Sequence, residues 1–275
     1  ACFDADSKCE PNYFKALENH FKENPRCHAA SIHYEHPIQG IDFEDDIYDS
    51  IILYELHLRY YVNAQKWAGF PLATQTIGSS MAVRASAYAK QGGMNKRKAG
   101  EDFYFLSKII QLGNFGEIYS TKVIPSPRVS DRVPFGTGKA IGDIIEQQIE
   151  DYTTYSFDAF IDLKLFFTQI ETSYHKNNYE QLPASIQKFI SYSEYTNKIE
   201  EIQKNTKTLK SYTQRFYFAF DAFWILKFVH FYRDTIQENQ LLNHEAFRLI
   251  EAFEIPFQKE ANNKELLSIY RAFDC

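Results

Sequence analysis

Cysteine is scarce and scattered in this sequence. The 275 residues contain four cysteines, at positions Cys2, Cys9, Cys27 and Cys275. Such a set is too small and too widely spaced for a disulfide framework or for a zinc site with closely paired ligands. We therefore expect reduced thiols and a cytoplasmic protein, with peripheral attachment to a membrane as the alternative location.

Positive charge is also in deficit, and long apolar runs are missing. The 30 Lys and Arg residues are outnumbered by 36 Asp and Glu residues, which leaves a net charge of −6. This balance argues against a nucleic-acid partner, because no face can be strongly basic on average. We expect no signal peptide at the start of the sequence. The most apolar window, residues 216–232, contains Asp221 and Lys227, so no transmembrane segment is expected.

Glycine is absent after residue 142. All 11 glycines lie between Gly40 and Gly142. The remainder is rich in Lys, Glu, Gln and Tyr, and its apolar residues recur at the helical spacing of about 3.6 residues. The sequence therefore predicts an α/β domain over residues 1–142 and an all-α domain over residues 143–275.

Periodicity and turn residues place the individual elements. Predicted helices of the first domain cover 11–24, 43–67, a short stretch ending at Tyr88, and 102–112, where Gly113 is the expected C-cap. Predicted strands cover 26–34, 76–83 and 115–124, and residues 125–138 form an irregular loop. Predicted helices of the second domain lie near 143–154, 157–173, 183–193, 209–236, 243–253 and 260–272. The polar segment 194–208 is left unassigned.

Two acids lie one residue apart at the start of the chain, in the sequence Phe3-Asp4-Ala5-Asp6-Ser7. If Cys2 and Phe3 end a strand, the carboxylates of Asp4 and Asp6 leave the sheet edge on the same side. Such a pair suits a divalent cation that keeps several waters and bridges to a diphosphate. The alternative is a solvated acidic turn.

A second acidic pair, Glu101-Asp102, follows Gly92-Gly93-Met94-Asn95 and Gly100. It falls at the start of the predicted helix 102–112, where the macrodipole and free N–H groups stabilise a carboxylate. The pair is either a helix cap or a source of a general base that removes a proton from an attacking hydroxyl.

Two further segments offer small or cationic groups. Gly78-Ser79-Ser80 combines close backbone approach with two hydroxyls, or alternatively serves only the packing of an edge strand. Residues 135–140 (Phe-Gly-Thr-Gly-Lys-Ala) lack the spacing of a phosphate loop. A helix that begins after Gly138 could still bind a phosphate, with Arg128 and Arg132 nearby.

The order of these motifs over residues 1–140 resembles the second half of family 2 glycosyltransferases of the GT-A fold. The resemblance implies that Asp4 and Asp6 hold Mg²⁺ or Mn²⁺ and the donor diphosphate. It also implies that Asp102 is the catalytic base of an inverting transfer, with Glu101 beside it. On this interpretation residues 78–80 line the floor of the donor or acceptor site, and Arg128 and Arg132 bind substrate.

The chain departs from the family pattern in several ways. The strand–helix units that bind the nucleotide base and ribose would precede Ala1, and no Gln-x-x-Arg-Trp motif is present. The segment 143–275 matches no pattern of the family. We therefore expect the partners to be a nucleotide-diphosphate sugar and a hydroxyl acceptor, but no transfer by this chain alone.

Two other classes of function stay open. The chain could be a catalytically silent fragment or pseudo-enzyme whose helical half binds a partner. It could also be a sugar-nucleotidyltransferase, although that class needs a glycine-rich nucleotide loop. An unpaired sheet edge tends to recruit another strand, so self-association into a homo-oligomer is a further expectation.

Overall fold

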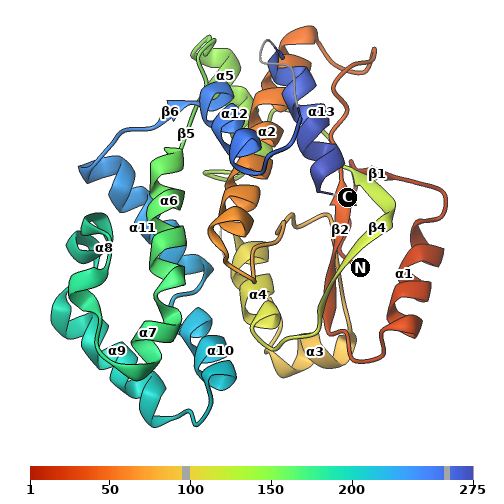
Figure 1. Ribbon diagram of the computed structural model, residues 1–275. Helices are drawn as coiled ribbons and strands as arrows, with labels where there is room; N and C mark the ends of the chain where they lie inside the picture. Colours follow the sequence, from red (N-terminus) through yellow and green to blue (C-terminus); the bar gives the residue numbers. More distant parts are fainter. Residues whose placement is uncertain (95–99, 257–260, 275) are drawn as a thin grey trace. The chain divides into compact units, whose positions relative to one another are not determined.

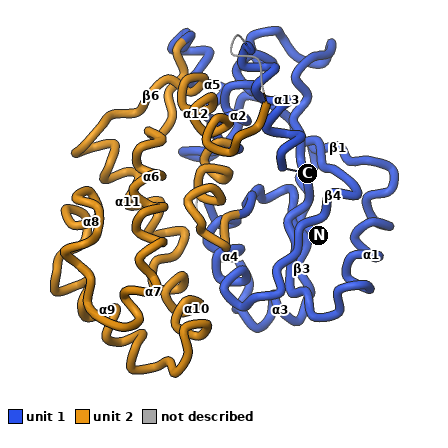
Figure 2. The backbone as a smooth tube through the Cα atoms, in the orientation of Figure 1, with its two compact units in different colours: residues 1–59, 74–150, 261–275 blue, residues 60–73, 151–260 orange. Residues whose placement is uncertain are grey.

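A computed structural model describes residues 1–94, 100–256 and 261–274 of the chain, which has a mixed α/β fold (Figure 1). The chain divides into two compact units, coloured separately in Figure 2. Unit 1 comprises residues 1–59, 74–150 and 261–275, and unit 2 comprises residues 60–73 and 151–260. The long helix α2 (Asp45–Ala68) contributes its first part to unit 1 and its last turns to unit 2. The domain boundary predicted after Gly142 stays a prediction.

A four-stranded mixed sheet forms the centre of unit 1, in the order β1-β4-β2-β3. These strands are β1 (Lys8–Cys9), β4 (Phe115–Ile124), β2 (Ala29–Tyr34) and β3 (Met81–Val83). β2 and β4 run parallel, and the two outer strands are antiparallel to their neighbours. Apart from His33, every side chain of β2 is buried, as expected for a central strand with both faces covered.

One residue near the N-terminus extends the sheet. Cys2 forms an isolated antiparallel bridge with Met81, in which the Cys2 N–H donates to the Met81 carbonyl at 2.9 Å. Because this bridge is antiparallel, the residues that follow Cys2 run toward residues 78–80, which lead into β3. The expected strand end at Cys2 and Phe3 is thus present as a single bridge.

The described residues of unit 1 also form the helices α1 (Tyr13–Glu23), the first part of α2, α3 (Ala85–Lys90), α4 (Glu101–Ile110), α5 (Thr137–Glu146) and α13 (Asn263–Phe273). α1 covers one part of the sheet with Tyr13 and Leu17. These side chains pack on Ala30, Ile32 and Ile118 of the two central strands. Burial of this apolar face explains why the amphipathic pattern at 11–24 gives a helix here.

The C-terminal helix α13 joins unit 1 through a buried ionic cluster. The Glu55 carboxylate of α2 accepts hydrogen bonds from Arg59 at 2.8 Å, from Arg271 at 2.7 and 2.8 Å, and from the His36 N–H at 2.9 Å. Arg59 also pairs with Asp274. We call these five residues the Glu55 cluster. Glu55 and Arg59 are almost completely buried, so their charges depend on these partners.

Unit 2 is mainly helical and has an aromatic core. Its elements are the last turns of α2, α6 (Phe157–Thr168), α7 (Ile170–His175), a 3₁₀ turn (Tyr179–Gln181), α8 (Ala184–Phe189), α9 (Tyr192–Lys204), α10 (Leu209–Ala219), α11 (Ala222–Thr235), α12 (Leu242–Ala252) and the short strands β5 (Thr153–Thr154) and β6 (Gln240–Leu241). Phe166, Phe216, Phe220 and Phe228 are buried at its centre. Phe166, Phe220 and Phe228 contact the ring of Trp224, and Phe216 contacts Phe166 and Phe220. The aromatic content of the sequence therefore serves this core.

Several predicted elements need correction. The predicted strand 76–83 is a strand only over β3, because Ile77 to Ser80 form a turn closed by a 2.9 Å backbone hydrogen bond. The predicted helix 143–154 starts earlier, at Thr137, and ends at Glu146. The second half is not wholly helical, since β5 pairs with β6. The unassigned segment 194–208 lies largely within α9.

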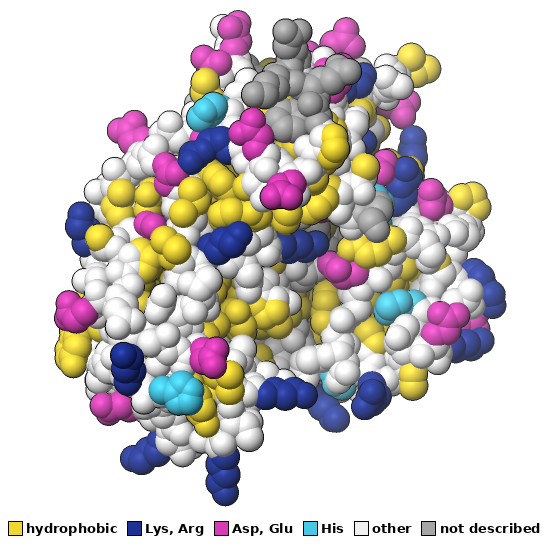
Figure 3. Space-filling model, viewed as in Figure 1, with side chains coloured by type: hydrophobic (Ala, Val, Ile, Leu, Met, Phe, Trp, Pro, Cys, Tyr) yellow, Lys and Arg dark blue, Asp and Glu magenta, His cyan; other side chains and the backbone are white. Residues whose placement is uncertain are grey.

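Surface charge is mixed on the face drawn in Figure 3, where lysine and arginine side chains are interspersed with aspartate and glutamate. Within the described part of the chain, no helix combines the length and apolar character that a bilayer crossing requires.

Candidate functional site

Asp102 lies in the first turn of α4, as the acidic pair predicted. The turn begins at Gly100, whose φ of +71° is a left-handed conformation that favours glycine. The Asp102 Oδ1 atom accepts a hydrogen bond from the Phe103 N–H at 2.7 Å. The carboxylate is therefore at the positive end of the helix, where a negative charge is stabilised.

The backbone of Gly78 packs directly against this carboxylate. A Cβ atom placed on Gly78 would lie 2.9 Å from Asp102 Oδ2, closer than real Cβ contacts allow. The structure therefore brings together two motifs that are separated by more than twenty residues in the sequence. Glycine at position 78 is what lets Asp102 occupy this position.

The electrostatic surroundings raise the pKa of Asp102. Burial is the largest cause, because it disfavours the charged form, and the negative charge of Glu101 acts in the same direction. Backbone hydrogen bonds from Phe103 and Gly78 oppose the shift without cancelling it. A carboxylate with a raised pKa is a better proton acceptor at neutral pH, as general-base catalysis requires.

Ser79 and Ser80 lie deeper in the unit than Gly78. Both side chains are buried, and the Ser80 carbonyl accepts the Ile32 N–H of β2 at 2.8 Å. The Ser80 Oγ atom has no hydrogen-bond partner in the described structure. Ser80 thus anchors the chain after Gly78 to the sheet. The contact of Ser79 and Ser80 with substrate stays a prediction.

Asp4 and Asp6 lie in an exposed turn before β1. The Ser7 N–H donates to the Asp4 carbonyl at 3.0 Å and closes this turn. The Asp6 carboxylate forms an ion pair with Arg128. The hydrogen bond from Arg128 lowers the pKa of Asp6, and the charge of Arg132 contributes in the same direction. The two predicted anion-binding arginines thus lie close to the predicted metal ligand.

The turn offers two carboxylates to a cation. Among the described residues, no group of three or more His, Cys, Asp or Glu side chains could hold a metal ion. Two carboxylates alone suit Mg²⁺ or Mn²⁺, which keep waters and complete their coordination with phosphate oxygens. Asp4 and Asp6 supply two of the oxygen ligands that such an ion needs, and their predicted binding of a metal and a diphosphate stays a prediction.

The loop between β4 and α5 contacts both acidic motifs. Arg128, near its start, pairs with Asp6. Near its end, the ring of Phe135 lies 3.2 Å from where a Cβ atom of Gly100 would be, immediately before Glu101. A 3.1 Å hydrogen bond from the Ser130 N–H to the Gly138 carbonyl closes the loop. The predicted site residues of the two motifs are connected through this one segment.

Two features of the loop before α5 differ from the sequence-based expectation. The contact of Phe135 with Gly100 was not predicted, and the only signal for it was an apolar residue between proline and glycine in an otherwise irregular loop. The glycine-rich segment does open helix α5, but this helix begins at Thr137, before Gly138. Asn95 of the glycine motif lies outside the described residues.

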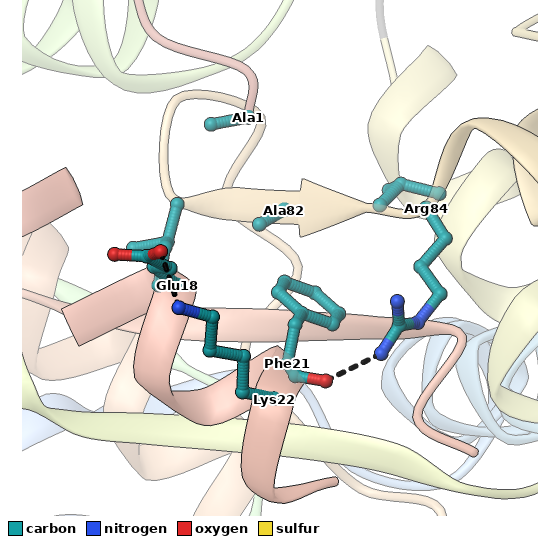
Figure 4. Close-up of a pocket in the computed structure, with 8 residues that line it drawn as sticks. Ala1, Glu18, Phe21, Lys22, Ala82 and Arg84 are labelled. Atoms are coloured by element: carbon teal, nitrogen blue, oxygen red, sulfur yellow. Dashed lines mark hydrogen bonds and ion pairs between the residues drawn. The ribbon is translucent and has the colours of Figure 1, made fainter. Parts of the chain in front are cut away.

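A groove of about 380 Å³ between α1 and β3 lies apart from these motifs (Figure 4). Phe21, Ala82 and Arg84 are among its lining residues. Its charged groups already have partners, since Glu18 pairs with Lys22 at 2.6 Å and Arg84 donates to the Phe21 carbonyl at 2.6 Å. It contains none of the predicted site residues, so the contacts of Asp102 are the stronger guide to function.

Comparisons of the chain with protein-family models, with curated proteins and with solved structures found no match in any of the three.

Proposed function

We propose that unit 1 belongs to an inverting glycosyltransferase that uses a nucleotide-diphosphate sugar as its donor and a hydroxyl group as its acceptor. The observation that carries this proposal is the carboxylate of Asp102, half-buried against the Gly78 backbone with a raised pKa. The resemblance of the motif order to family 2 enzymes of the GT-A fold adds to it.

The donor end of the site would be the turn that contains Asp4 and Asp6. These carboxylates would hold Mg²⁺ or Mn²⁺, and the bound ion would neutralise charge on the departing diphosphate. Arg128 and Arg132 are close enough to Asp6 to influence its ionisation, so they can also offer guanidinium groups to phosphate oxygens.

Asp102 would act on the acceptor. Its carboxylate takes the proton of the acceptor hydroxyl as that oxygen attacks the anomeric carbon, and the bond from this carbon to the diphosphate oxygen breaks. The proton stays on Asp102 until solvent removes it. Glu101 shares the first turn of α4 and keeps the local potential negative, which favours proton uptake by its neighbour.

Calorimetry tests the donor end directly on the 275-residue chain. We expect inorganic pyrophosphate and the diphosphates of uridine, guanosine, cytidine and thymidine to be titrated with measurable heat only when Mn²⁺ is present. Asp6→Asn should weaken this metal-dependent binding. Asp42→Asn is the matched control, because Asp42 is also an exposed acid paired with a cation, Lys8. Equal affinity with and without Mn²⁺ for every ligand would contradict the proposal and leave the silent binding module as the better interpretation.

A further inference from the structure

Phe135 presents an apolar ring to solvent close to the candidate base. Its side chain is 57% exposed, while one edge of the ring rests on Gly100. Single exposed apolar residues are common on protein surfaces and need no function. The position of Phe135 is different because glycines hold the backbone on both sides of the contact, in the loop after Phe135 and at Gly100.

Three glycines maintain this arrangement. Gly136 follows the ring with a φ of +117°, which side chains other than hydrogen rarely allow. Gly138 has no room for a Cβ atom, since Ser130 Cβ would be 2.7 Å away. Gly100 accepts the ring at 3.2 Å from its own missing Cβ position. A larger residue at any of the three would move the ring or its loop.

The Phe135 ring contacts Gly100, so an aromatic surface lies beside the start of α4. Gly100 directly precedes Glu101 and Asp102, and the Asp102 carboxylate is fixed by Phe103 and Gly78. A sugar ring carries both kinds of group that such a surface would bind. Its C–H face is apolar and packs on the negative face of an aromatic ring, and its hydroxyl groups hydrogen-bond to carboxylates.

We propose that Phe135 is a positioning residue on which the acceptor's sugar ring stacks, and that the acceptor is therefore a carbohydrate. This inference rests on the proposed function and names the acceptor class of the same site. The donor's nucleobase is the less favoured occupant. The candidate diphosphate contacts lie near Arg128, at the start of the loop between β4 and α5. Phe135 lies near the end of this loop, where it contacts Gly100 just before α4, the helix that contains Asp102.

A binding experiment tests the stacking without any turnover. 4-Fluorophenylalanine is placed at position 135, and at position 14 as the control, because Phe14 is an exposed phenylalanine of the same unit on α1. The ¹⁹F resonance is followed with the methyl β-glycosides of glucose, galactose and N-acetylglucosamine, with uridine and guanosine, and with glycerol. We expect a saturable shift at position 135 with at least one glycoside, and no shift at position 14 or with glycerol.

Three results would overturn the proposal: no shift with any glycoside, the same shift at both positions, or a shift at 135 with the nucleosides alone.

The kinetic counterpart compares Phe135→Ala and Phe135→Tyr in the full-length protein, with sugar transfer as the readout. The alanine variant should raise the acceptor KM on the order of tenfold with the donor KM unchanged, and tyrosine should restore it. An alanine variant that lowers kcat alone would contradict stacking. If the full-length protein transfers no sugar to any acceptor, the proposed function fails, and the resonance shifts still decide whether the ring binds sugar.

Discussion

The Asp102 carboxylate sits where its ionisation is costly, and this cost gives it a signature different from that of a helix cap. Loss of an N-terminal cap typically destabilises a protein by about 1 kcal/mol. Loss of a half-buried carboxylate with a raised pKa has the opposite effect at neutral pH, because it removes the cost of ionisation. Both folded and unfolded chains are neutral at this position below the unfolded pKa of ~3.9. As the pH rises through the higher folded pKa, the native state loses stability relative to a neutral residue.

Asp102→Asn should therefore raise the urea midpoint at pH 7, and this gain should shrink as the pH falls through the raised folded pKa and be absent below about 4. In the full-length protein, with any sequence that precedes Ala1, the same variant should lower transfer by about 10²–10⁴-fold, with donor binding unchanged. Glu101→Gln is the control and should have the milder effect on transfer. A less stable variant with a near-normal transfer rate would return Asp102 to the role of a cap.

At the scale of elements, the attachment of α13 to α2 depends on buried charge. Burial alone would raise the pKa of Glu55, but hydrogen bonds from His36 and Arg271 and the charge of Arg59 hold it well below the ordinary range. Glu55→Gln leaves two arginines short of a counter-charge, and we expect it to destabilise the chain by about 3–5 kcal/mol.

Denaturant unfolding followed by circular dichroism measures this effect. Glu18→Gln is the matched control, because Glu18 also pairs with two cations but lies on the surface of α1. Its midpoint should stay close to that of the unchanged chain. Equal midpoints for the two variants would show that the Glu55 cluster does not stabilise unit 1.

How far the sequence predicts these elements depends on whether the deciding interaction is local. The helices α1 and α2 and the strands β2 and β4 follow from apolar spacing and were predicted within a few residues. The predicted helix 209–236 is two helices, because the Asp221 side chain accepts the N–H groups of Phe223 and Trp224 and starts α11. That cap is visible in the sequence only as an acid within an apolar run.

Distant pairings could not be predicted. β5 and β6 are two residues each and pair across more than eighty positions, so no periodicity identifies them. At the candidate site, the motif order suggested a common location for Gly78 and Asp102, and the contact between them is present. The ion pair of Asp6 with Arg128 depends on a loop conformation that the sequence does not encode in any simple pattern.

At the scale of the molecule, the two units can be monitored separately. Both tryptophans of the sequence, Trp67 and Trp224, belong to unit 2. Trp67 donates to the Ala252 carbonyl at 3.0 Å, and Trp224 lies in the aromatic core. Tryptophan fluorescence therefore reports unit 2, while hydrogen exchange of β2 reports unit 1.

Deletion of residues 261–275 removes α13 and with it Arg271 and Asp274. We expect faster hydrogen exchange in β2 by at least tenfold, since the lost pairing is worth more than about 1.4 kcal/mol, with tryptophan emission little changed. Lys264→Ala, which removes only an exposed hydrogen bond to Gln39, should leave exchange in β2 as it was. Unaltered protection of β2 after the deletion would refute this expectation.

The Glu55 cluster also sets an order of events during synthesis. Arg59 and its partner Asp274 are 215 residues apart, so unit 1 starts to emerge before unit 2 and can be completed only after residue 274 has been made. Unit 2 ends at residue 260 and can close before it. At a typical 5–20 residues per second, the charged residues of α2 wait for roughly ten seconds or more without their C-terminal partners. A ribosome-bound chain stopped before α13 would therefore carry a finished helical unit and a unit 1 in which all four strands are made but the Glu55 cluster is incomplete. That nascent intermediate is where a chaperone would be needed.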